Sequence, residues 1–164
     1  MELYLIRHGI AQERDSATID EDRALTKIGQ DKTKEVAKRL YNLGLRFDTI
    51  LTSPLVRSCQ TAEIFTACQL TSQLQISTDL APNGNIHSWL KWLEQQQYPP
   101  SSKLALIGHQ PDLGQWASLL VWGKANEGLI LKKAGIIGLT LPLAGSPIGQ
   151  SQMFWVTQPK FLLV

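Results

Sequence analysis

The sequence predicts an α/β protein, a three-layer α/β/α sandwich whose central sheet is mostly parallel. Short apolar runs alternate along the chain with longer amphipathic stretches, which is the pattern of strands followed by helices. The chain has 164 residues, of which 43% are hydrophobic, so it is long enough to close one core of ordinary size. No repeat or long linker divides it, and we expect a single domain over residues 1–164.

The strands are predicted from short apolar runs bounded by turn residues. Five such runs occur, at residues 3–6, 49–52, 104–107, 136–141 and 153–156. Amphipathic stretches that open on capping residues predict the helices. Thr26 is the expected N-cap of a first helix, and Ser53 followed by Pro54 predicts the start of a second. Residues 86–97 and 111–122 are the other two predicted helices. The inner face of the first helix is expected to bury Val36, Ala37, Leu40 and Leu43.

Composition and charge limit the class of protein. The net charge is only +2, which argues against binding nucleic acid through a broad basic surface. No apolar stretch approaches the roughly 20 residues that cross a bilayer, and the N-terminus does not read as a signal peptide, so we expect a cytoplasmic protein that does not bind membranes. Cys59 and Cys68 fall about half a turn out of phase on one predicted helix, too far apart to bridge, and are expected to be buried and reduced.

Polar residues with catalytic potential follow three of the predicted strands directly. Arg7, His8 and Gly9 come after the first strand, Arg57 lies in the helix after the second, and His109 follows the 104–107 strand. If these strands are parallel, their carboxyl ends meet at one edge of the sheet, where open α/β sheets bind ligands. Two imidazoles among guanidinium groups suit a tetrahedral anion, and phosphate is the anion that arginine grips best.

Each of these residues also has a structural interpretation. An isolated histidine is more often a hydrogen-bonded structural residue, and an isolated arginine on a helix is usually a surface charge. Gly9 and Gly108 favour the ligand site, because a glycine beside each histidine allows the backbone to approach a ligand closely. A metal site is disfavoured, since no carboxylate stands at ligand spacing and arginines flank the histidines.

Four blocks of the sequence together resemble the histidine phosphatase superfamily, also called phosphoglycerate mutase-like. The blocks are "RHG", "RALTKIGQ", "SPLVRSCQTA" and "GHQP", and they occur in the family's order. The resemblance implies a phosphoglycerate mutase-like fold and a reaction without metal or other cofactor. It further implies that His8 is the nucleophile that becomes phosphorylated, that Arg7 and Arg57 clamp the phosphoryl oxygens, and that His109 stabilises the transition state.

One departure from the superfamily pattern bears on the substrate. Pro82 stands where members that hydrolyse alkyl phosphates usually carry an acid, and only 52 positions separate Arg57 from His109. Both features resemble the compact SixA-type phosphohistidine phosphatases. Because imidazole is a better leaving group than an alkoxide, a phosphohistidine substrate needs less acid assistance. An acid of the loop after the first strand is the alternative donor: Asp15, Asp20, Glu21 or Asp22.

The predicted function is therefore a metal-independent phosphatase acting on protein phosphohistidine through a covalent phosphohistidine intermediate. The expected partner is a phosphorylated protein, with a histidine phosphotransfer domain as one candidate, and the oligomeric state is not predicted. Arg23 is predicted to bind substrate, its alternative being an ion pair with its acidic neighbours. Two other functions stay open at this point: a phosphatase for small phosphomonoesters, and a non-catalytic phosphate-binding module.

Overall fold

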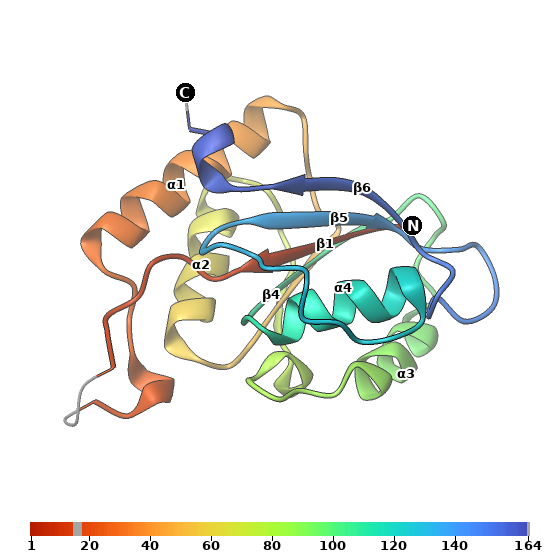
Figure 1. Cartoon of the computed structure of the whole chain (residues 1–164). Coiled ribbons are helices and arrows are strands. Elements are labelled where there is room, and N and C mark those ends of the chain that lie inside the picture. The colour runs from red at the N-terminus through yellow and green to blue at the C-terminus, as the bar shows by residue number, and fades with distance from the viewer. Residues whose placement is uncertain (15–17, 164) are drawn as a thin grey trace.

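The computed structural model describes residues 1–14 and 18–163, and within them a six-stranded sheet forms the centre of the fold (Figure 1). The strand order is β3-β2-β4-β1-β5-β6. The strands are β1 (Glu2–Arg7), β2 (Thr49–Thr52), β3 (Leu74–Ile76), β4 (Lys103–Gly108), β5 (Ile136–Thr140) and β6 (Gln152–Thr157). The first four pair in parallel, whereas β5 is antiparallel to both of its neighbours. The predicted mostly parallel α/β sheet is confirmed.

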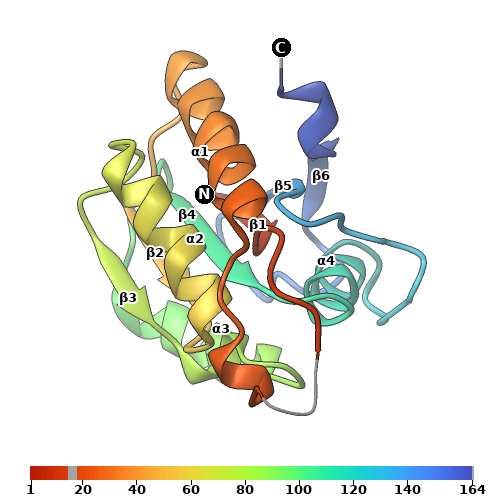
Figure 2. The ribbon, with the colours of Figure 1, turned by 90° about the vertical axis from the view of Figure 1, so that its left-hand side faces the viewer.

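Helices cover both faces of this sheet (Figure 2). The helices are α1 (Lys27–Asn42), α2 (Val56–Ala67), α3 (Ile86–Gln96) and α4 (Asp112–Trp122). Alternate residues of β1 enter two separate cores, because side chains alternate across a strand. Leu3 and Leu5 pack with α3 and α4, whereas Tyr4 and Ile6 pack with α1 and α2. Burial on both faces explains why the central strands read as continuous apolar runs.

The start of α1 agrees with its predicted cap, but its end does not. The Thr26 hydroxyl accepts a hydrogen bond from the Gly29 N–H at 3.0 Å, so Thr26 caps the helix as expected. Val36, Ala37 and Leu40 are fully buried. Leu43, however, is 56% exposed, so its predicted burial was wrong. It stands at the C-cap, where the chain leaves the helix and its side chain no longer follows the buried face.

The start of α2 corrects the sequence interpretation. The helix begins at Val56 with Leu55 as N-cap, so Ser53 and Pro54 lie before it and are not its cap and first residue. The Ser53 hydroxyl accepts a hydrogen bond from the Leu55 N–H at 3.3 Å, within the turn that joins β2 to α2. The serine is therefore part of a tight turn at the end of the strand rather than of the helix.

Two smaller expectations also needed correction. Strand β3 was not predicted, because it is short and its residues are exposed, so no apolar run marks it. Cys59 and Cys68 are free, but both are half-buried rather than buried. Within the described part of the chain, no helix combines the length and the apolar character needed to span a membrane.

Candidate active site

The pairing of β1 with β4 brings together the two sequence blocks that contain His8 and His109. Arg7 is paired with Gly108 in the parallel register, so the residue after each strand emerges at the same edge of the sheet. The His8 N–H continues this ladder by donating to the Gly108 carbonyl at 3.1 Å. As a result, the ring centroids of His8 and His109 lie 5.2 Å apart. The predicted meeting of strand ends is confirmed for these two residues.

Strand β2 and helix α2 add a third group to this edge. The Ser53 N–H donates to the Ile107 carbonyl at 2.9 Å, which places the end of β2 beside the end of β4. Arg57 follows in the first turn of α2, and its Nε donates to His8 Nε2 at 3.3 Å. His8, Arg57 and His109 are all buried, at 7%, 3% and 4% exposure. Three of the four predicted catalytic side chains therefore form one compact cluster.

A hydroxyl on α2 fixes this helix against the end of β1. Thr61 Oγ1 accepts from the Gly9 N–H at 3.0 Å and donates to the Arg57 carbonyl at 2.7 Å. Gly9 packs tightly against α1, because a Cβ there would lie 2.3 Å from Thr33 Oγ1. Close approach of the Gly9 backbone to a ligand stays a prediction.

His8 is held as a neutral ring whose unprotonated nitrogen accepts a hydrogen bond from Arg57. The pKa of His8 is lowered to about 3, chiefly by burial and further by His109, Arg57 and Arg7, against a raising contribution from the Gly9 carbonyl. His8 Nδ1 lies 2.7 Å from that carbonyl oxygen, which can only accept, so Nδ1 carries the proton. The lone pair is therefore on Nε2, the nitrogen that faces Arg57.

His109 is neutral for the same reason. Burial lowers its pKa to about 4, and the charge of Arg57 contributes in the same direction. Its Nε2 forms a hydrogen bond with Ser53 Oγ at 2.8 Å, which orients the ring. Ser53 is a residue of this cluster that the sequence interpretation missed as a site residue. Its position in a "Ser-Pro" turn after a strand was the available signal, but it was interpreted as a helix cap.

Arg7 lies beside the cluster, but its guanidinium forms its hydrogen bond with a segment outside the cluster. Its Nη1 donates to the Leu131 carbonyl at 2.9 Å, in the segment before β5. Burial and the charge of Arg57 both lower the pKa of Arg7. The charge of Arg7 in turn lowers the pKa of His8 and of His109, so its guanidinium acts electrostatically on both rings. Its clamping of a phosphoryl group stays a prediction.

An acidic residue from the loop after β1 reaches Arg57. Asp20 Oδ2 accepts from Arg57 Nη2 at 3.1 Å, and its backbone carbonyl accepts from Arg57 Nη1 at 2.6 Å. Asp20 Oδ1 also pairs with Arg23 Nη2 at 2.8 Å and with Arg14 Nε at 2.9 Å. These charge-assisted contacts lower the pKa of Asp20 to about 2. In this arrangement the carboxylate is ionised near neutral pH, and proton donation by a loop acid stays an untested alternative.

The remaining loop acids and Arg23 lie outside the cluster. Glu21 and Asp22 are exposed, and Asp15 lies outside the described residues. Arg23 pairs with Asp20 and donates to the Gln12 carbonyl at 2.7 Å. Arg23 is therefore linked to Arg57 only through Asp20, which pairs with both. This contact is the ion pair with an acidic neighbour that was the alternative role of Arg23. Substrate binding by Arg23 stays a prediction.

The position expected for an acid in other members of the superfamily carries no acid here. Pro82 is exposed, in the turn between the 3-10 turn η2 (Thr78–Leu80) and α3. Among the residues that the structure describes, no group of three or more His, Cys, Asp or Glu side chains is arranged to hold a metal ion. The cluster that remains combines the guanidinium of Arg57 with the two neutral rings of His8 and His109, with Arg7 beside them.

Comparisons with known proteins agree with this geometry. The model of the histidine phosphatase superfamily (branch 1) matches residues 3–99. An uncharacterised protein of Picosynechococcus sp. is 49% identical over 164 residues, or 99% of each chain. Phosphohistidine phosphatase SixA of Escherichia coli is 27% identical over 154 residues, or 93% of each chain. A structure of the protein histidine phosphatase SixA complexed with tungstate superposes with a TM-score of 0.82 at 25% identity, covering 99% of both chains. The chain therefore belongs to the histidine phosphatase superfamily, with the phosphoglycerate mutase-like fold of SixA and the hydrolytic chemistry of a phosphatase.

Proposed function

We propose that this phosphatase removes phosphate from phosphohistidine on a protein, and that His8 carries the phosphoryl group between the two half-reactions. The observation that carries the proposal is the state of His8: a buried neutral ring with Nδ1–H tied to the Gly9 carbonyl and the Nε2 lone pair beside Arg57. A nucleophile already neutral at physiological pH needs no base to activate it.

In the first half-reaction the His8 Nε2 lone pair attacks phosphorus. The new bond joins Nε2 to phosphorus, and the bond between phosphorus and the substrate ring breaks, with the electron pair going to that ring. Positive charge develops on the His8 ring as the bond forms, and the Gly9 carbonyl at 2.7 Å from Nδ1 stabilises it. The guanidinium of Arg57 and the hydrogen-bonding ring of His109 stabilise the phosphoryl oxygens.

In the second half-reaction water attacks the phosphorus bound to His8. The bond between Nε2 and phosphorus breaks, and its electron pair returns to Nε2, so His8 regains its starting state. The proton released by the water remains on the phosphate product. Without substrate, the Asp20 carboxylate accepts a hydrogen bond from Arg57 Nη2. A phosphoryl oxygen that accepts from the same nitrogen must displace this carboxylate.

The missing acid favours phosphohistidine over alkyl phosphates as the substrate. A substrate ring that is protonated at its other nitrogen leaves as neutral imidazole and requires no further proton. An alkoxide requires one, and general acid assistance is worth roughly 10²–10⁴-fold. Neither exposed Pro82 nor ionised Asp20 supplies that proton. A phosphorylated protein, such as a histidine phosphotransfer domain, is the partner that fits this chemistry.

The experiment is a panel of substrates of graded leaving-group ability. A phosphohistidine peptide and an activated aryl phosphate should be turned over, whereas phosphoserine peptides and sugar phosphates should be turned over at least about 10²-fold more slowly, the lower value for acid assistance. His8→Ala protein serves as the control for contaminating phosphatases. Equal kcat/KM for phosphoserine and phosphohistidine peptides of one sequence would contradict the proposal.

A further inference from the structure

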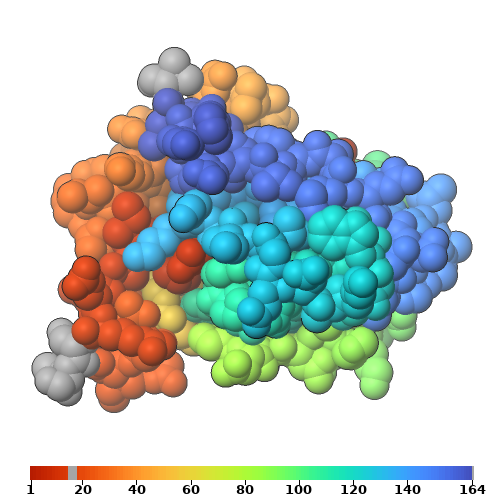
Figure 3. All heavy atoms as spheres, in the orientation of Figure 1, coloured from red at the N-terminus to blue at the C-terminus, as the bar shows by residue number. Residues whose placement is uncertain are grey.

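A cavity of about 420 Å³ has Arg7 in its lining and lies next to the active-site cluster. It lies between α1, the segment before β5 and the chain that follows β6. Figure 3 shows this face of the molecule, with the light-blue segment before β5 between the dark-blue C-terminal chain and the red and orange N-terminal chain. Its lining is strongly basic and, among the described residues, includes no acidic side chain. Besides Arg7, the basic lining residues are Lys32, Lys132, Lys133 and Lys160, and we call the cavity the lysine pocket.

The lysines of this pocket are not neutralised within the described chain. Among the described residues, the lysines with a carboxylate partner are Lys27, with Asp31 at 2.8 Å, and Lys103, with Glu2 at 2.7 Å. The four lysines of the lysine pocket form no ion pair among the described residues, and Lys160 lies over the ring of Phe161 instead. Like charges that line one cavity repel each other and attract an anionic ligand.

Hydrogen bonds tie the lysine pocket to the nucleophile. Arg7 Nη1 donates to the carbonyl of Leu131, the residue before Lys132. The N–H of Ala134, the residue after Lys133, lies 3.0 Å from the Arg7 carbonyl and 3.1 Å from the His8 carbonyl. Arg7 lines the pocket, whereas His8, the next residue of the chain, does not. A protein substrate is large enough to contact the pocket while its phosphoryl group is at His8.

The chemistry of the lining selects among anions. The volume falls in the range of sites that hold a whole small ligand, so it is larger than one phosphate requires. Lysine ammonium groups are flexible single-point donors, unlike the arginine fork that fixes one phosphate. Apolar groups from Ile10, Ala134, Pro159 and Leu163 also line the cavity. Several separate negative charges on an apolar support are what a polypeptide with Asp or Glu side chains offers.

We propose that the lysine pocket binds acidic side chains of the protein that carries the phosphohistidine. This inference rests on the proposed function and deepens it, because it assigns the region that selects among phosphorylated proteins. Binding energy from this remote region would position the phosphoryl group at His8. The preference should appear in kcat/KM and should weaken as salt screens the charges.

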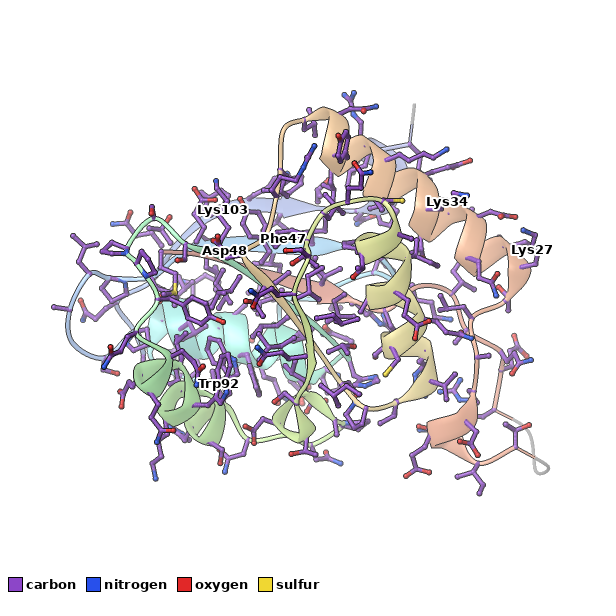
Figure 4. All side chains as sticks on the ribbon, turned by 180° about the vertical axis from the view of Figure 1, so that it is seen from behind. Lys27, Lys34, Phe47, Asp48, Trp92 and Lys103 are labelled. Atoms are coloured by element: carbon purple, nitrogen blue, oxygen red, sulfur yellow. The ribbon has the colours of Figure 1, made fainter. Side chains whose placement is uncertain are left out.

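The test uses two phosphohistidine peptides that differ only in flanking residues, glutamates in one and glutamines in the other. Wild-type protein should have at least about tenfold higher kcat/KM for the acidic peptide, which corresponds to about 1.4 kcal/mol. Lys132→Gln/Lys160→Gln should abolish this preference. Lys34→Gln/Lys38→Gln is the matched control: it removes the same charge from exposed positions of α1 that lie outside the lysine pocket (Figure 4 labels Lys34).

Direct binding separates this inference from the proposed function. Fluorescence anisotropy of the unphosphorylated acidic peptide should detect binding to wild-type and control proteins, and loss of binding in Lys132→Gln/Lys160→Gln. Equal kcat/KM for the two peptides, or a preference that survives in the lysine-pocket variant, would overturn the inference while leaving the proposed function intact. If neither phosphohistidine peptide is turned over, the proposed function fails, and the anisotropy alone decides: binding that depends on Lys132 and Lys160 supports the pocket, and its absence overturns it.

Discussion

Mild acid should destabilise the folded protein because His8 and His109 are buried as neutral rings. Their pKa values are lowered to about 3 and about 4, whereas histidines in the unfolded chain have pKa values of about 6.5. As the pH falls below about 6.5, the unfolded chain binds two protons that the folded protein does not bind. The unfolded state is thereby favoured, so the free energy of unfolding decreases as the pH falls.

The size of this loss in the free energy of unfolding follows from the difference between the pH and the pKa of a histidine in the unfolded chain. At about pH 5 both rings are still neutral in the folded protein, so each contributes roughly 1.5 units at 1.36 kcal/mol per unit, or about 2 kcal/mol. Both rings together then remove about 4 kcal/mol, a large share of an ordinary domain's stability. Asp20 contributes only at lower pH: because its pKa is lowered, its share of the stability is lost below the ordinary value for an aspartate.

Urea unfolding at about pH 7.5 and at about pH 5 measures this difference. Wild-type protein should lose about 4 kcal/mol between the two conditions, His8→Gln and His109→Gln about 2 kcal/mol each, and the double variant almost nothing. Each variant is compared with itself at the two pH values, so its own packing defect cancels. A loss below about 1 kcal/mol in the wild type would refute the buried neutral histidines.

Three further results are expected. Arg57→Lys should lower kcat/KM by about 10²–10³-fold, because Arg57 uses three different nitrogens toward His8 and Asp20 and an ammonium offers one; steady-state kinetics on an aryl phosphate measures the loss. Asp20→Asn should lower KM by up to about fivefold, because the partly buried ion pair with Arg57 no longer competes with phosphate; a fall in kcat restricted to alkyl phosphates would instead identify Asp20 as an acid. Turnover of phosphohistidine peptide should persist after exhaustive chelation, and activity that disappears and returns with one added metal would contradict a phosphoryl site built from arginines.

The central strands and the meeting of His8 with His109 could be predicted from the sequence. Strands buried on both faces appear in the sequence as uninterrupted apolar runs. Parallel strands place their carboxyl ends at one edge of the sheet. The residue after each run is therefore expected at that edge, even when the register of the strands is unknown. Strand β3 leaves no such run, because it pairs only with β2 at the edge of the sheet and exposes its side chains. A strand held by backbone pairing alone has little signature in its residue types.

The contacts of Asp20 and Ser53 could not be predicted, because both depend on how a turn or loop folds back. Asp20 meets Arg57 across 37 positions of the chain, and four acids of its loop were equally eligible before the structure selected one. Ser53 has the residue type and the following proline of a helix cap, and only the later start of α2 at Val56 releases its hydroxyl toward His109. Side-chain partners of this kind are set by tertiary geometry rather than by local pattern.

Trapping the phosphoryl group on the protein tests the central claim most directly. Wild-type protein that is mixed briefly with phosphohistidine peptide, quenched in alkali and digested with trypsin should yield one phosphorylated peptide, residues 8–14, with an acid-labile phosphate on His8. His8→Gln protein should yield none and should retain its fold by circular dichroism. Phosphate found on His109 or on another residue, or turnover by the His8→Gln variant at the wild-type rate, would contradict the account.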